Sequence, residues 1–167
     1  LEFISKKTDK QTLNIYRNFF KYLEPKYPLH NSIVLNSENG FVSGETLNLR
    51  NKGVAVYKNI NTRGFENLYF KHGGGKKNTK LIFRKNSRDG KIIASINLNQ
   101  NKYWFNGKNN SYFKIKIKKE IKPFDLYIEA INNDLFTNNS VSYDYKDLAA
   151  QLDWISFLPN IPVSNST

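Results

Sequence analysis

Residues 113–130 read FKIKIKKEIKPFDLYIEA, and this stretch decides the fold class. Apolar and lysine residues alternate strictly in residues 113–118, and residues 124–130 alternate in the same way after Pro123. A period of two places every second side chain on the same face of an extended strand. The stretch therefore predicts two β-strands that follow one another in the sequence, each with one apolar face and one polar face.

Similar short runs occur on both sides of this stretch, separated by turn sequences such as Gly73-Gly74-Gly75 and Asn106-Gly107. Short strands without intervening helices are typical of an all-β, antiparallel β-sandwich. The further strands expected are residues 32–35, 53–60, 65–71, 80–84, 91–98 and 152–158.

The N-terminal region has a different pattern. Apolar residues recur at three- and four-residue steps in residues 8–23, which predicts a helix, and Pro25 and Pro28 end it. We expect residues 1–30 to be a helical extension and linker from a preceding domain, residues 31–160 to be the sandwich, and residues 161–167 to be a tail or linker. The absence of Met, with Leu1 first, indicates a piece of a longer protein.

Composition excludes several classes of protein. With no Cys, the chain has no disulfide framework, thiolate zinc site or Cys nucleophile. The net charge of +12 comes mostly from Lys in an Asn- and Ile-rich chain, the composition of an AT-rich genome, so we expect no specific nucleic-acid partner. No apolar run is long enough for a membrane span. Aromatic residues make up 14%, which favours a domain that meets sugars outside a cell.

An ordered set of segments resembles a known family. The segments are residues 53–61, 65–70, 79–84, 89–96, Tyr103-Trp104, 124–129 and 152–157. In this order and spacing the chain resembles a family 6 carbohydrate-binding module, or the related family 35 type.

The resemblance implies a jelly-roll β-sandwich that binds a polysaccharide or glycan through a loop cleft at one end, a cleft on a sheet face, or both. It also implies a non-catalytic accessory domain of a larger secreted, bacterial protein, such as a glycoside hydrolase. The alternative is a receptor- or glycan-contacting jelly-roll domain of a secreted bacterial toxin or surface protein.

The resemblance also implies the ligand-binding residues. Trp104, beside Tyr103, matches the loop ring that stacks on sugar, although it could instead plug the end of the sandwich. Gln151 matches a ligand-binding amide, and Asn48 stands where the family has a second aromatic platform. Independently, strand alternation turns Tyr69 and Tyr127 away from the core, where they form a sheet-face sugar site or remain ordinary cross-strand tyrosines.

Many relatives hold a structural Ca²⁺, and the matching positions here are Asp153, Asn36 and the nearby Glu38. Calcium prefers several oxygen ligands, so the amide in place of a carboxylate leaves this site open to question. The lysines at 114, 116 and 118 predict a basic stripe that meets anionic glycans or is simply solvated. No pair of acidic residues shares a catalytic motif, so we do not expect the domain itself to be an enzyme.

Overall fold

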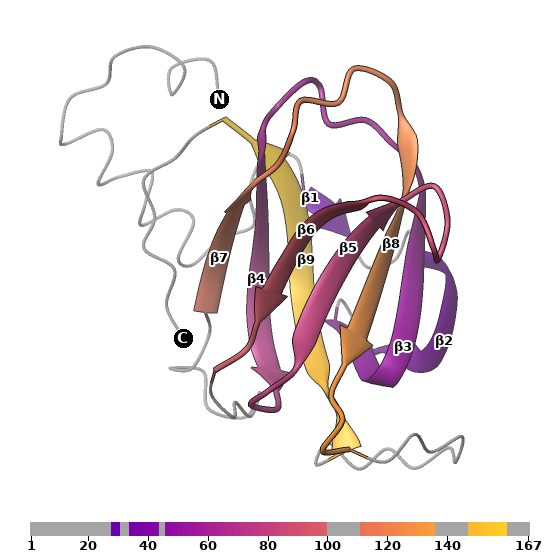
Figure 1. Cartoon of the computed structure of the whole chain (residues 1–167), viewed down its shortest axis with the longest axis vertical. Coiled ribbons are helices and arrows are strands. Elements are labelled where there is room, and N and C mark those ends of the chain that lie inside the picture. The colour runs from indigo at the N-terminus through magenta and orange to yellow at the C-terminus, as the bar shows by residue number, and fades with distance from the viewer. Residues whose placement is uncertain (1–27, 31–33, 44–45, 100–110, 136–146, 160–167) are drawn as a thin grey trace, which may run out of the picture.

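The computed structural model describes residues 28–30, 34–43, 46–99, 111–135 and 147–159. Within these ranges the chain forms β-strands and turns, with no α-helix (Figure 1). No helix in this part of the chain could therefore cross a membrane. The strands are β1 Pro28–His30, β2 Val34–Ser43, β3 Thr46–Ile60, β4 Asn67–Gly75, β5 Lys80–Lys85, β6 Ile92–Asn97, β7 Ser111–Lys116, β8 Phe124–Ile131 and β9 Ala150–Leu158.

Hydrogen-bonded strands follow the order β6-β5-β8-β3-β9-β4-β7, with β1 added beside β9 and β2 beside β3. Every ladder is antiparallel. The long strand β3 joins the two halves, because Leu47–Leu49 pair with β9 whereas residues 53–60 pair with β8. In Figure 1, β5 and β6 lie in front of β4 and β9. The predicted antiparallel β-sandwich is confirmed.

The core is a single cluster to which both halves contribute. In β8 the predicted alternation is confirmed: Phe124, Leu126, Ile128 and Ala130 are buried, and the residues between them are partly exposed. Aromatic contacts join the halves. The Phe70 ring of β4 stacks on Phe113 of β7 at a centroid distance of 5.0 Å and lies 5.6 Å from Phe83 of β5.

The predicted turn at Gly73–Gly75 is wrong, since these glycines continue β4, where Gly74 pairs with Gln151 and Gly75 with Ala150. The strand expected at residues 32–35 instead forms β2, which continues to Ser43. Register shifts beside Asn36 and Asn39 break the period of two in β2. The full length of this strand therefore could not be predicted from alternation of apolar and polar residues. The predicted helix at residues 8–23 lies outside the described residues.

An exposed ion pair joins β3 to β8. Lys58 Nζ lies 2.8 Å from Asp125 Oδ2, and the Asn59 backbone N–H donates to Asp125 Oδ1 at 2.9 Å. The hydrogen bond from Lys58 and the one from the Asn59 amide lower the pKa of Asp125. The hydrogen bond between the Lys58 and Asp125 side chains also raises the pKa of Lys58.

This pair predicts a small pH effect. Because the folded pKa of Asp125 lies below its unfolded value of about 4, its contribution to stability is present above pH ~4 and is lost as pH falls through the folded pKa. We expect Asp125→Asn to lose less stability than the wild type between pH 5 and pH 3 in urea unfolding. Lys58→Gln should reduce the same pH difference. An unchanged pH dependence in both variants would contradict the assignment.

Candidate functional site

Two of the predicted ligand-binding residues meet across one row of the sheet. Asn48 of β3 pairs with Gln151 of β9, and Gln151 also pairs with Gly74 of β4. Gln151 Nε2 donates a hydrogen bond to Asn48 Oδ1 at 2.8 Å. Asn48 Nδ2 in turn donates to the carbonyl oxygen of Thr46 at 3.1 Å. The structure therefore brings Asn48 and Gln151 together and fixes the orientation of both amides.

These two amides are largely enclosed, with 1% of Asn48 and 4% of Gln151 exposed. The Gln151 side chain rests on the backbone of Gly74, so that a Cβ at position 74 would lie 1.9 Å from Gln151 Oε1. No described residue donates a hydrogen bond to that oxygen. A side chain at position 74 would therefore force Gln151 to move, and within the described part of the chain Oε1 is an acceptor without a donor.

The segment with the predicted stacking ring is attached at the same end of the sandwich. Tyr103 and Trp104 lie outside the described residues, but both flanks are described. On one side, Leu98 exchanges backbone hydrogen bonds of 2.8 Å with Asn78 and Thr79 in the β4–β5 connection. On the other side, Ser111 pairs with His72, two residues before Gly74. The chain that carries Trp104 therefore leaves and rejoins the sheet beside Gln151.

A buried polar network, which no sequence pattern had indicated, holds this end together. Thr79 Oγ1 donates to the Ala149 carbonyl at 2.9 Å and accepts from Asn132 Nδ2 at 2.9 Å. Asn132 Nδ2 also reaches the Lys77 carbonyl at 2.9 Å, and its backbone N–H donates to Asn51 Oδ1 at 2.8 Å. All three polar side chains are at least 96% buried. A satisfied buried network of this kind specifies one arrangement of the strands it joins.

The two tyrosines proposed for a sheet-face cleft lie on strands that are not neighbours. Tyr127 is partly exposed on β8, beside Val56 of β3. Tyr69 is on β4, with β3 and β9 between the two strands. Tyr69 is only 1% exposed, and its hydroxyl donates to the Pro159 carbonyl at 3.1 Å. The structure does not bring the two rings together.

The proposed calcium ligands have cationic neighbours. Asp153 Oδ2 lies 2.7 Å from Lys71 Nζ, and Glu38 Oε2 lies 2.7 Å from Arg88 Nη1. The Asn36 side chain lies outside what the structure describes. Among the described residues, no three His, Cys, Asp or Glu side chains gather as a metal site would require. A lysine or arginine competes with Ca²⁺ for each carboxylate, so these residues do not form a ready cation site, and calcium stays a prediction.

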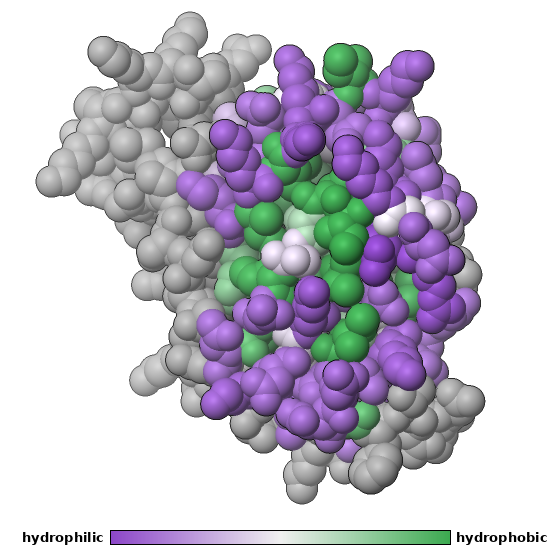
Figure 2. Space-filling model, in the orientation of Figure 1, coloured by the Kyte–Doolittle hydropathy of each residue, from purple (hydrophilic) through white to green (hydrophobic). Residues whose placement is uncertain are grey.

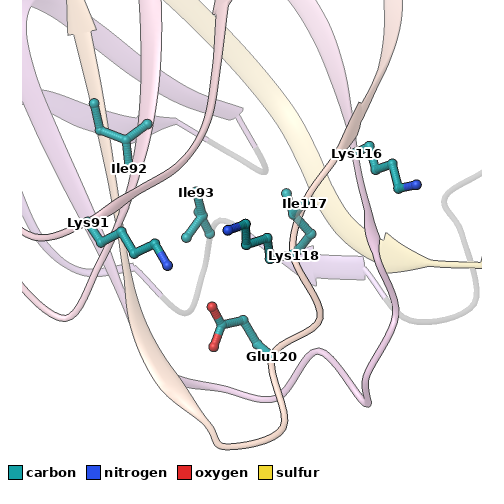
Figure 3. A pocket seen from close by; sticks show the side chains of 7 residues that line it. All are labelled: Lys91, Ile92, Ile93, Lys116, Ile117, Lys118 and Glu120. Atoms are coloured by element: carbon teal, nitrogen blue, oxygen red, sulfur yellow. The ribbon is translucent and has the colours of Figure 1, made fainter.

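A groove lies beside the start of β6 and the end of β7, away from the end of the sandwich where the segment with Trp104 is attached (Figure 3). Its volume is about 360 Å³, and it lies between the start of β6 and the residues that follow β7. Lys116 and Lys118 of the predicted basic stripe line it, together with Lys91 and Glu120. Alternation predicted that the lysines of the basic stripe share one face of a strand. It could not predict that Lys116 and Lys118 would line the same groove as Lys91, which the fold determines.

Comparison with known proteins supports the fold. No protein-family model and no curated protein sequence matches the chain. A family 6 carbohydrate-binding module of Clostridium stercorarium, solved with cellobiose, is similar with a TM-score of 0.61 and 13% identity, covering 80% of this chain and 94% of that one. A family 6 module from Clostridium cellulolyticum, solved with xylose, has a TM-score of 0.61 and 13% identity, covering 79% and 96%.

A longer protein contains a similar domain. The family 43 arabinoxylan arabinofuranohydrolase from Bacillus subtilis, solved with cellotetraose, has a TM-score of 0.51 and 12% identity, covering 74% of this chain and 24% of that one. At these identities the similarity establishes the fold. The chain has the β-sandwich fold of family 6 carbohydrate-binding modules.

Proposed function

We propose that this chain is a non-catalytic carbohydrate-binding module. Its binding site is the end of the sandwich where Gln151 rests on Gly74 and is hydrogen-bonded to Asn48, and where the segment with Trp104 is attached. The ligand is a polysaccharide or glycan, and the module directs a larger secreted bacterial protein to it.

One observation carries this proposal. Gln151 is oriented by its hydrogen bond to Asn48 and keeps one acceptor, Oε1, without a described donor. A sugar hydroxyl is a donor that fits this acceptor, and a neighbouring aromatic ring can stack on the apolar face of the pyranose. The similar modules from Clostridium stercorarium and Clostridium cellulolyticum were solved with cellobiose and with xylose, which supports a neutral sugar as ligand.

The acidic residues support a binding function over an enzymatic one. A glycosidase requires two carboxylates held across a cleft. Here Glu38, Asp125 and Asp153 each form an ion pair, of 2.7–2.8 Å, with a lysine or arginine. The similar domain within the Bacillus subtilis hydrolase supports a glycoside hydrolase as the parent protein.

The test is binding of the purified chain to an array of neutral oligosaccharides that includes cellobiose and xylo-oligosaccharides. We expect retention on at least one of them. Trp104→Ala should weaken binding roughly tenfold, because stacking on an aromatic ring contributes on the order of 1–2 kcal/mol. Tyr127→Ala, on the distant strand β8, is the matched aromatic control and should bind normally. Failure to bind any glycan would reject the proposal and favour a receptor-contacting domain of a toxin or surface protein.

A further inference from the structure

The two end strands of the sheet, β6 and β7, approach each other without forming a ladder. The groove lies at this seam, where β6 begins and β7 ends. Its apolar lining comes from Ile117, which is buried, Ile93, which is half-buried, and Ile92, which is 47% exposed. A volume of about 360 Å³ falls within the usual range for small-ligand sites, roughly 300–1,000 Å³.

The groove carries an excess of positive charge. Lys91, Lys116 and Lys118 line it, and none of them has an acidic partner among the described residues. Glu120 is the acidic residue among the described lining residues, and it forms an ion pair with Lys85 of β5, so its charge is already balanced. Three unpaired ammonium groups beside an apolar wall attract an anion more strongly than scattered surface lysines do.

The orientation of the side chains makes this a two-sided site. Figure 3 shows the ammonium groups of Lys91 and Lys118 directed over the groove from opposite walls, with the Glu120 carboxylate facing the same space. Lys116 points away from the centre and adds charge at the rim. A ligand in the groove therefore meets two donors, one acceptor and an isoleucine surface.

We propose that this groove binds a polysaccharide that carries carboxylate groups, such as a polyuronate. Its carboxylates match the lysines, its hydroxyls can donate to Glu120, and its C–H surface can contact the isoleucines. Nucleic acid fits less well, because the described lining residues include no aromatic ring on which a base could stack. Lysine ammonium groups are point charges that do not require the planar, bidentate geometry suited to arginine.

This site is separate from the neutral-sugar site proposed above. Six-residue β6 runs from the groove towards Leu98, so the groove and the Gln151 end are about 20 Å apart along the strand. The inference does not depend on the proposed function. Each site can be tested with variants that leave the other unchanged.

The experiment is affinity electrophoresis and calorimetry of the whole chain with polygalacturonate. Fully methyl-esterified polygalacturonate serves as the matched polymer, because it has the same sugar backbone without the charge. We expect binding to the acidic polymer only, weakening as salt is raised from 20 to 200 mM. The double substitution Lys91→Gln with Lys118→Gln should weaken binding about tenfold, as expected for two exposed charge interactions.

The control is Lys80→Gln with Lys122→Gln, which removes the same charge from exposed positions outside the groove. This variant should bind within twofold of the wild type. An equal loss in both double variants would mean that general charge is responsible and would overturn the proposal. So would equal binding of the esterified polymer, or tighter binding of single-stranded DNA or polyglutamate than of polygalacturonate. Neutral-sugar binding, measured on the same variants, should not change.

Discussion

Gly74→Ala is expected to abolish binding of the neutral glycan and to lower the free energy of unfolding by about 2 kcal/mol. A Cβ at this position would lie 1.9 Å from Gln151 Oε1 and 2.8 Å from Gln151 Cδ, distances too short for any side chain to remain in place. Gln151 must turn away. Its hydrogen bond to Asn48 is then lost, and the acceptor proposed for the sugar moves.

The backbone itself does not oppose this substitution. Gly74 has no positive φ, unlike Gly64 and Gly75, so alanine can adopt its conformation. Alanine in a strand usually stabilises relative to glycine by roughly 0.5–1 kcal/mol. Any destabilisation therefore measures the contact with Gln151 and not backbone strain.

A double-mutant cycle separates the two effects. Gly74→Ala combined with Gln151→Ala removes the clash, so the stability penalty of the alanine at 74 should disappear. Glycan binding should stay absent, because the amide is gone. Urea unfolding and calorimetric titration on the four proteins provide the measurements. Normal binding by Gly74→Ala would show that Gln151 has no part in the site.

The alternation of apolar and polar residues was sufficient to predict strands in which that alternation is regular. It failed where contacts with a segment far along the chain determined the local structure. Residues 124–130 alternate strictly, and β8 follows that alternation residue by residue. The glycines at 73–75 have no side chains to show a pattern and were interpreted as a turn. They are a strand because Gln151, far along the chain, packs on Gly74.

The candidate site was predictable only in part, for the same reason. The order of segments suggested Gln151 and Asn48, and these two residues do meet. Alternation placed Tyr69 on the opposite face of the strand from Leu68 and Phe70, but it could not show that this side chain would be buried and hydrogen-bonded to the Pro159 carbonyl. In an Asn-rich chain, Asn132 looks like any loop residue, because its partners Asn51 and Thr79 are 81 and 53 positions away.

Asn132→Ala is expected to give a second large effect, a loss of roughly 2–4 kcal/mol in the free energy of unfolding. The substitution removes both hydrogen bonds from Nδ2 and leaves the Lys77 carbonyl and the Thr79 hydroxyl without this donor. It also removes Oδ1, which accepts from the Asp134 backbone N–H at 3.0 Å. Water cannot easily replace these bonds, because Asn132 is 1% exposed.

The loss should spread to the glycan-binding end. Thr79 is the residue whose backbone carbonyl accepts from the Leu98 N–H, beside the segment that carries Trp104. We therefore expect the Leu98 and Asn78 amides to exchange hydrogen faster in Asn132→Ala, and glycan affinity to fall although no ligand contact was removed. Asn133→Ala, one residue on and exposed, is the matched control and should change stability by less than about 0.5 kcal/mol.

A second pair of variants keeps the test decisive if Asn132→Ala does not fold. Thr79→Val has nearly the same shape as threonine but loses the hydroxyl, whereas Thr79→Ser keeps it. If the network holds this end, Thr79→Val should be the less stable of the two and show faster exchange at Leu98. The valine variant should lose the bond to Ala149 and leave Asn132 with Lys77 as its remaining acceptor. Equal stability of the two variants, with unchanged exchange at Leu98, would show that packing around Thr79, not its hydrogen bonds, positions the end of the sandwich.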